Sequence, residues 1–336
     1  MADLHTHRAV EAVWRIEAAR LVAGLAKMTR DVGLAEELAQ DALVIALAQW
    51  PQDGIPANPG AWLMQTAKRR AIDQFRRRKM VAGKMPGLTY EAELREQEAP
   101  DDERRLDDDV KDNLLSLIFT ACHPMLSPEA RSALTLRLVG GLSTAEIARA
   151  YLVPEPTIQQ RIVRAKKTLA EAHVPFEVPR GEERLRRLGS VLEVLYLIFN
   201  EGYSATAGED WMRPDLANEA MRLARMLAAL APDEPEVLGL QGLLELQGSR
   251  MTARLDEYGA PVLLEAQDRT RWDQLLIKRG LAALRQAELL AARGKPVGKY
   301  FLQASIAAQH ARAKRAEDTD WRRIAALYDV LAGAAP

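Results

Sequence analysis

Residues 143–169 read STAEIARAYLVPEPTIQQRIVRAKKTL, two stretches of helical periodicity joined by a short turn that is marked by prolines. In the second stretch an apolar side chain recurs about once per helical turn, at Ile158, Ile162, Ala165 and Leu169. These spacings place the four side chains on one face of a helix, and that face must pack inward. The stretch therefore predicts a pair of helices, and with it a helical fold.

The opposite face of that second helix is polar and basic. It carries Thr157, Gln159, Gln160, Arg161, Arg164 and Lys167. The planar groups of glutamine and arginine match adenine and guanine edges in the major groove of DNA, whereas lysine and threonine suit phosphates. The alternative is an amphipathic hairpin whose charged face is merely solvated, and the stretch alone leaves both interpretations open.

Capping residues mark where several predicted helices begin. Ser143 and Glu146 have the spacing of a capping box at the start of the first helix of the pair. Ser127 and Asn58 are each followed directly by proline, the composition of an N-cap with proline at the first helical position. Residues 51–60, rich in Pro, Gly and Asn, are predicted to form a loop.

The composition favours an all-α protein. The chain has 336 residues, 48% apolar and 28% charged, and helix-forming Ala, Leu, Arg and Glu are frequent in nearly every segment, enough for two or three domains. The single cysteine, Cys122, excludes an intramolecular disulfide and a cysteine-rich zinc site. Because the start lacks the apolar core of a signal peptide and no apolar run approaches the roughly 20 residues of a membrane span, we expect a cytoplasmic protein without membrane contact.

The net charge of -1 hides a basic block followed by an acidic block. Residues 61–80 hold seven basic side chains against the single carboxylate of Asp73, on a predicted helix. Residues 91–112 reverse this, with eleven carboxylates against four basic side chains. Such asymmetry indicates specific partners for each block, and the Gly and Pro residues beyond residue 80 predict a flexible acidic linker.

Taken together, these segments resemble a bacterial extracytoplasmic-function sigma factor, the small class with only regions two and four. Residues 31–50, DVGLAEELAQDALVIALAQW, resemble the region that grips core RNA polymerase. Residues 58–79, NPGAWLMQTAKRRAIDQFRRRK, resemble the helix that binds and opens the minus-ten promoter element. The opening stretch resembles the helix-turn-helix that reads the minus-thirty-five element, and the similarity covers about residues 8–175.

The resemblance implies an all-α fold: a region-two helical bundle over 1–80, an acidic flexible linker over 81–112 and a region-four helix-turn-helix domain over 113–178. The linker would thread the RNA exit channel of the polymerase, because the basic wall of that channel attracts the carboxylates of the linker. Promoter DNA and core RNA polymerase are the implied partners. No cofactor, metal or catalytic residue is implied.

The resemblance also implies roles for individual side chains. The polymerase clamp helices would contact Glu37, Gln40 and Asp41, which share a helix face at i, i+3 and i+4. The minus-ten DNA would contact Trp62, Lys68, Arg69, Asp73 and Arg76. Many family members have asparagine in place of Arg69, which leaves details of promoter melting open, and core packing is the alternative for Trp62. The polar face of 155–171 would contact the minus-thirty-five DNA.

Residues 179–336 resemble the long C-terminal extension of one subgroup of these sigma factors. Helix-length apolar periodicity predicts a helical-hairpin domain similar to tetratricopeptide (TPR) arrays, although no clean 34-residue repeat is found. Polar residues beside aromatics are predicted to organise a junction with the sigma regions: Asn200, Glu201, Tyr203, Asp210, Trp211, Arg271, Trp272, Asp318, Asp320 and Trp321. The extension would then regulate the sigma factor, through a regulatory protein or a ligand.

Other classes of function fit less of the chain. The five histidines are scattered, without a metalloprotease, phosphate-loop or nucleophile-elbow motif, so no enzyme is expected. Cys122 beside His123 is predicted to be a buried thiol, because adjacent residues point to different faces of a helix. A one-component helix-turn-helix regulator would not need the basic helix of 61–80, and a TPR-like scaffold would explain neither basic helix.

Overall fold

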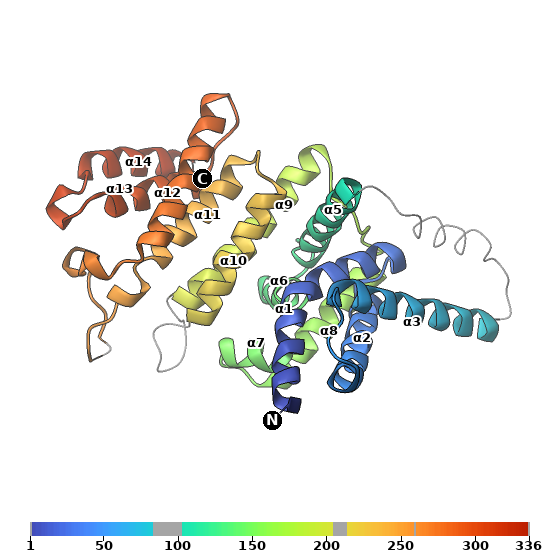
Figure 1. Cartoon of the computed structure of the whole chain (residues 1–336). Coiled ribbons are helices and arrows are strands. Elements are labelled where there is room, and N and C mark those ends of the chain that lie inside the picture. The colour runs from blue at the N-terminus through green and yellow to red at the C-terminus, as the bar shows by residue number, and fades with distance from the viewer. Residues whose placement is uncertain (1, 83–102, 204–213, 259, 335–336) are drawn as a thin grey trace. The chain divides into compact units, whose positions relative to one another are not determined.

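The computed structural model describes residues 2–82, 103–203, 214–258 and 260–334 (Figure 1). It divides into two compact units, one formed by Met1–Ile147 with Glu155–Arg187 and the other by Ala148–Pro154 with Leu188–Pro336. Helices dominate both units, and within the described ranges the only β-pairing is an isolated antiparallel bridge between Leu255 and Pro261. The all-α prediction is confirmed.

In the first unit, the N-terminal half of the chain forms three long helices. They are α1 (Ala2–Thr29), α2 (Val32–Asp53) and α3 (Pro59–Ala82). Each of the three packs against the other two. The Asp31 carboxylate begins α2 by accepting hydrogen bonds from the amides of Gly33 and Leu34, at 2.8 and 3.1 Å.

The rest of the first unit is built mainly by shorter helices of residues 103–171, of which only Ala148–Pro154 are grouped with the second unit. They are α5 (Glu103–Ala121), α6 (Pro128–Leu138), α7 (Thr144–Ala150) and α8 (Glu155–Glu171). Helix α5 packs against α1 and α6, and α8 packs against α6 and α2. Segments predicted to lie on either side of the linker therefore share one compact unit.

Three predicted N-caps are confirmed. The Asn58 side chain accepts a hydrogen bond from the Ala61 amide at 3.0 Å, and Ser127 caps α6 through the Ala130 amide at 3.3 Å. At α7, Ser143 and Glu146 exchange side-chain to backbone hydrogen bonds of 2.8 and 3.1 Å, the reciprocal pattern of a capping box. These caps depend on a few adjacent residues, which is why the sequence reveals them.

Two predicted boundaries differ from the structure. Helix α2 continues through Pro51 to Asp53: the proline loses one hydrogen bond and crowds the preceding turn, but the Trp50 carbonyl still accepts from the Gly54 amide at 3.0 Å and closes one more turn. Gly54, at φ 85°, then ends it, so the connection to α3 is shorter than predicted. Helix α5 begins at Glu103, inside the predicted linker, since its Glu, Arg and Leu residues are good helix formers. Residues 83–102 of that linker lie outside the described residues.

The second unit takes in α9 (Gly181–Tyr203) from Leu188 onward, followed by helices connected in series. They are α10 (Pro214–Leu230), α11 (Pro235–Gly248), α12 (Gln274–Ala292), α13 (Lys299–Arg312) and α14 (Trp321–Ala334), with 3-10 turns at Met251–Ala253, Leu264–Ala266, Arg269–Arg271 and Ala316–Asp318. Helix α11 is the centre of this unit, packing against α10, α12 and α13. A Cβ on Gly239 would lie 2.6 Å from the Phe301 amide nitrogen, so α11 and α13 approach backbone to backbone.

A carboxylate of α11 caps α13 from outside. Glu236 accepts hydrogen bonds from the amides of Gly298, Tyr300 and Phe301 at 2.9, 3.1 and 3.0 Å. These are amides of the first turn of α13, which have no partner inside their own helix. The side chain thus fixes the pairing of two helices that are 50 residues or more apart in sequence.

Replacing Glu236 with alanine is expected to destabilise the second unit by about 1–3 kcal/mol, because three amides lose their acceptor. Urea unfolding followed by circular dichroism measures the change, and hydrogen exchange places it in α13. Glu288→Ala, which removes an exposed carboxylate of α12, is the matched control and should stay within about 0.5 kcal/mol of the parent. Equal effects of the two substitutions would contradict the capping role.

Across the described ranges, none of the helices combines the length and the apolar character that spanning a membrane requires.

Candidate nucleic-acid interface

Helix α8 has the two faces that its sequence predicts. The seam of Ile158, Ile162, Ala165 and Leu169 is buried, which confirms that side as the packing face. On the other side Gln159, Gln160, Arg164 and Lys167 are exposed, while Thr157 and Arg161 are half-buried. We call these six polar side chains the recognition face. They are held on one rigid helix and include two arginine forks, a pattern suited to base edges and phosphates together.

The first turn of α8 is tied to the first turn of α7. The Thr144 hydroxyl donates to the Glu155 carboxylate at 2.8 Å, and Gln159 donates to the same carboxylate at 3.3 Å. Leu152, in the connecting turn, has φ 50°, the left-handed conformation that a tight reversal requires. The sharp connection and the bond between the two first turns give this segment the form of a helix-turn-helix.

The predicted polymerase-binding residues of α2 are accessible. Glu37 and Asp41 are exposed and Gln40 is half-buried. Asp41 forms an ion pair with Arg70 of α3 at 3.1 Å, and Gln40 donates to Glu36 at 2.5 Å. A basic partner that binds this face would therefore have to replace the ion pair of Asp41 with Arg70 and the hydrogen bond of Gln40 to Glu36.

Sequence reasoning missed Glu36, whose carboxylate is almost completely buried, at 4% exposure. It accepts from Arg137 Nε of α6 at 2.5 Å and also pairs with Lys166 of α8. Arg137 in turn donates to the Leu142 carbonyl at 3.0 Å. We call Glu36, Arg137 and Lys166 the Glu36 clasp; it connects helices from both sides of the predicted linker. No local pattern reveals it, since glutamate is usually exposed.

Helix α3 turns its predicted DNA-binding side chains away from the buried side formed by Leu63, Ala67 and Ala71. Arg69, Asp73 and Arg76 are exposed and Lys68 is half-buried. The sequence prediction for these residues is a set of contacts to minus-ten DNA, and the exposure is compatible with it.

Trp62, at the start of α3, is half-buried and meets the edge of Trp50, with ring centroids 5.3 Å apart and planes inclined by 66°. Trp50 itself is buried at the end of α2. The ring of Trp62 thus packs on one side and remains accessible on the other, so both interpretations of this residue keep support.

The residues predicted to form a junction all belong to the second unit or lie outside the described residues. Tyr203 stacks on Phe199 at 5.1 Å, Trp272 is buried, and Trp321 meets the His310 ring edge-on at 5.4 Å. Arg271 and Asp318 lie in short 3-10 turns, and Asn200 and Glu201 end α9 half-buried.

Three of the residues predicted to form the junction give it no support. Asp320 has a local role, because its carboxylate caps α14 by accepting from the Arg323 amide at 2.9 Å. Asp210 and Trp211 are outside the described residues. A link from these residues to the sigma regions stays a prediction.

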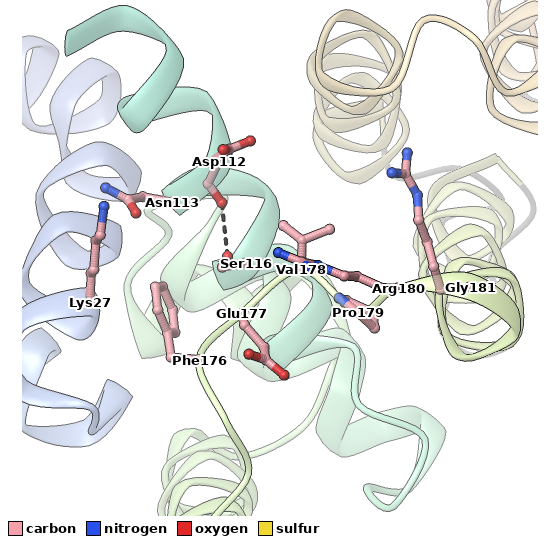
Figure 2. Close-up of a pocket in the computed structure, with 11 residues that line it drawn as sticks. Lys27, Asp112, Asn113, Ser116, Phe176, Glu177, Val178, Pro179, Arg180 and Gly181 are labelled. Atoms are coloured by element: carbon pink, nitrogen blue, oxygen red, sulfur yellow. Dashed lines mark hydrogen bonds between the residues drawn. The ribbon is translucent and has the colours of Figure 1, made fainter. Parts of the chain in front are cut away.

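The first unit contains a polar pocket of about 940 Å³ (Figure 2). Its wall combines Lys27 at the end of α1, Asp112 and Ser116 of α5, and the stretch from Phe176 to Arg184. The Ser116 hydroxyl donates to the Asp112 carbonyl at 2.8 Å. Charges of both signs line the pocket.

The thiol of Cys122 is buried, as predicted. Burial raises its pKa to about 11, and its Sγ lies 3.2 Å from the Thr135 hydroxyl. A protonated, covered thiol is a poor nucleophile. Nor do the described residues contain a cluster of His, Cys, Asp or Glu side chains that could hold a metal ion.

Comparison with known proteins covers most of the chain. Residues 16–80 match Sigma-70 region 2, residues 116–169 match Sigma-70 region 4, and residues 187–288 match a family of unknown function (DUF6596). An uncharacterized protein of Rhizobium meliloti (strain 1021) is 44% identical over 309 residues, which cover 91% of this chain and 71% of the relative. No solved structure matches the sequence.

Proposed function

Since the chain belongs to the sigma-70 family, as an extracytoplasmic-function type sigma factor with a C-terminal extension, we propose how its surfaces serve transcription initiation. Sigma factors bind core RNA polymerase and promoter DNA and are not themselves catalysts. In this chain the α2 face of Glu37, Gln40 and Asp41 contacts the polymerase. The exposed side of α3 holds the minus-ten element, and the recognition face of α8 reads the minus-thirty-five element.

The observation that carries this proposal is the division of α8 into a buried apolar seam and an accessible recognition face. Gln160, Arg161 and Arg164 project from one helix, so they reach successive base pairs of one major groove. Lys167 lies further along the same side and suits a phosphate, which fixes register without reading sequence.

Reconstitution with purified bacterial core RNA polymerase tests the function. The full chain should associate with core and direct initiation from a subset of promoter fragments, whereas core alone should not. Binding of the chain to duplex DNA with no dependence on polymerase would instead favour a one-component regulator. A chain that binds neither core nor DNA would favour a scaffold and overturn the proposal.

The second unit is proposed to control the first. The matched region of unknown function begins near the point where α9 leaves the first unit, so the first unit and the extension are joined through one helix. A change in the second unit therefore has a direct covalent route to the promoter-binding unit. The second unit has a core of its own, centred on α11, and so can respond to a signal as a separate body.

Truncation after Arg187 is expected to change initiation by about tenfold or more while promoter binding by the holoenzyme stays measurable, because typical coupling between sites amounts to about 1–3 kcal/mol. The cut keeps the hydrogen bond from Arg187 to the Phe119 carbonyl, 2.9 Å long, inside the first unit. Transcript yield and DNA affinity are measured on the same preparations. Unaltered transcription after truncation would contradict control by the extension.

A further inference from the structure

Three arginines gather around two aromatic rings in the second unit. Arg254 lies over the Tyr203 ring, 3.7 Å from its centroid, and Arg250 donates to the Tyr203 hydroxyl at 2.9 Å. Arg250 and Arg269 both lie over Trp272, at 5.8 and 4.9 Å. We call Arg250, Arg254 and Arg269 the arginine cluster. Arg250 and Arg254 flank one 3-10 turn and Arg269 begins another, so the fold concentrates positive charge at this place.

Among the described residues, no carboxylate lies within ion-pair distance of the arginine cluster. In the part of the chain that the structure describes, none of its three guanidinium groups forms an ion pair with a carboxylate. Arg254 and Arg269 donate to uncharged acceptors instead. Arg254 donates to the Tyr203 carbonyl, and Arg269 donates to the carbonyls of His310 and Ala313 at 2.5 and 2.8 Å and to the Thr319 hydroxyl at 3.3 Å. Asp318 acts on Arg269 electrostatically, without reaching ion-pair distance. Half-buried cations usually have a counter-charge in direct contact, and here the described residues supply only the more distant carboxylate of Asp318.

Hydrogen-bond donors are also in surplus. The indole Nε1 of Trp272, which is 3% exposed, and the Nε of Arg269 are buried without an acceptor among the described residues. Burial, and then the charges of Arg250 and Arg269, lower the pKa of His310 against a smaller opposing effect of the Glu265 carboxylate, so the neutral form of the ring is favoured. The surroundings thus disfavour a further cation and favour an acceptor that carries negative charge.

We propose that the arginine cluster is a binding site for a small oxyanion ligand, a molecule that bears a phosphate or carboxylate group. Guanidinium forks pair with two oxygens of such a group at once, and half-burial strengthens the pairing relative to the open surface. Arg254 and Arg269 are anchored on backbone carbonyls, so they offer fixed positions. Arg250 is bound by one phenol hydroxyl and one ring face and is the arginine freest to turn toward the ligand. Under the proposed control of the first unit by the second, binding of this ligand would be the signal.

Binding is tested on the full chain alone, with inorganic phosphate and malonate as probes of the two oxyanion types and sodium chloride at equal ionic strength as the reference. Titration calorimetry and thermal unfolding should show saturable binding and a rise in melting temperature for at least one probe. The probe that binds more tightly identifies the group. Failure of both probes to act beyond chloride would overturn the site and leave the promoter-binding proposal untouched, since no polymerase is present.

Arg250→Gln is expected to weaken binding about tenfold or more, and Arg250→Lys, which keeps the charge but loses the fork, to weaken it by a smaller factor. Arg285→Gln removes the same charge from an exposed position of α12 and should leave binding unchanged. Circular dichroism confirms that each variant is folded; if Arg250→Gln is not, the Arg250→Lys comparison decides. Equal losses in the Arg250 and Arg285 variants would show a general charge effect and sink the proposal.

Discussion

Replacing Glu36 with alanine is expected to cost the first unit about 3–5 kcal/mol of unfolding free energy, because it leaves Arg137 and Lys166 without their shared buried counter-charge. The loss should appear as a lower urea midpoint. Hydrogen exchange should locate it at the contacts of α2 with α6 and α8. It is the largest stability effect that we expect from a single side chain of this protein.

Glu37→Ala is the matched control for this prediction. It removes a neighbouring carboxylate of the same helix that is exposed and should change stability by no more than about 0.5 kcal/mol. A Glu36→Ala, Lys166→Met double variant should recover part of the loss, since one of the two stranded cations is then absent. A Glu36 effect as small as the Glu37 effect would mean that the clasp contributes nothing to stability.

Removing both arginines of the recognition face is expected to lower the affinity of the holoenzyme for promoter DNA by about 2–6 kcal/mol, the sum of about 1–3 kcal/mol for each base contact. Arg161→Ala, Arg164→Ala is compared with the parent on fragments that vary only in the minus-thirty-five bases. The parent should discriminate among these fragments and the variant should not. Competition binding at fixed salt concentration measures both.

Lys167→Ala provides the contrast for that experiment. A lysine on a phosphate supports all sequences alike, so its removal should weaken binding uniformly and lower the salt dependence by about one ion. Discrimination among the fragments should survive. If the double arginine variant keeps its affinity, or loses the same affinity on every fragment, then α8 does not recognise the minus-thirty-five bases.

The features that the sequence predicted correctly are local ones. The seam of α8 follows from side chains one turn apart, and the capping box of Ser143 and Glu146 from a spacing of three residues. The predicted loop over 51–60 was too long, because α2 contains Pro51 and the bond from the Gly54 amide to the Trp50 carbonyl closes another turn. Exposure of Arg164, Glu37 and Asp41 follows from the same periodicity.

Features that join distant parts of the chain could not be predicted in this way. Glu36 and Arg137 are 101 positions apart, and nothing near either residue marks the other as its partner. Arg250 and Arg269 are ordinary basic residues in the sequence; only the packing of α9, α11 and the following turns places them on Trp272. Tertiary contacts of this kind depend on the whole fold.

The Glu36 clasp also limits how far the protein can reach. Promoter elements named for positions 25 base pairs apart are separated by about 85 Å of straight B-form DNA, at about 3.4 Å per pair. A compact body of about 180 residues is only about 40 Å across. For α3 and α8 to hold both elements at once, as proposed, the two helices must separate, and the contacts of the Glu36 clasp must open. The stabilising free energy of the clasp is therefore lost when both elements are bound, which lowers the affinity for the full promoter. A partner that opens the clasp beforehand removes this loss and makes binding of both elements easier.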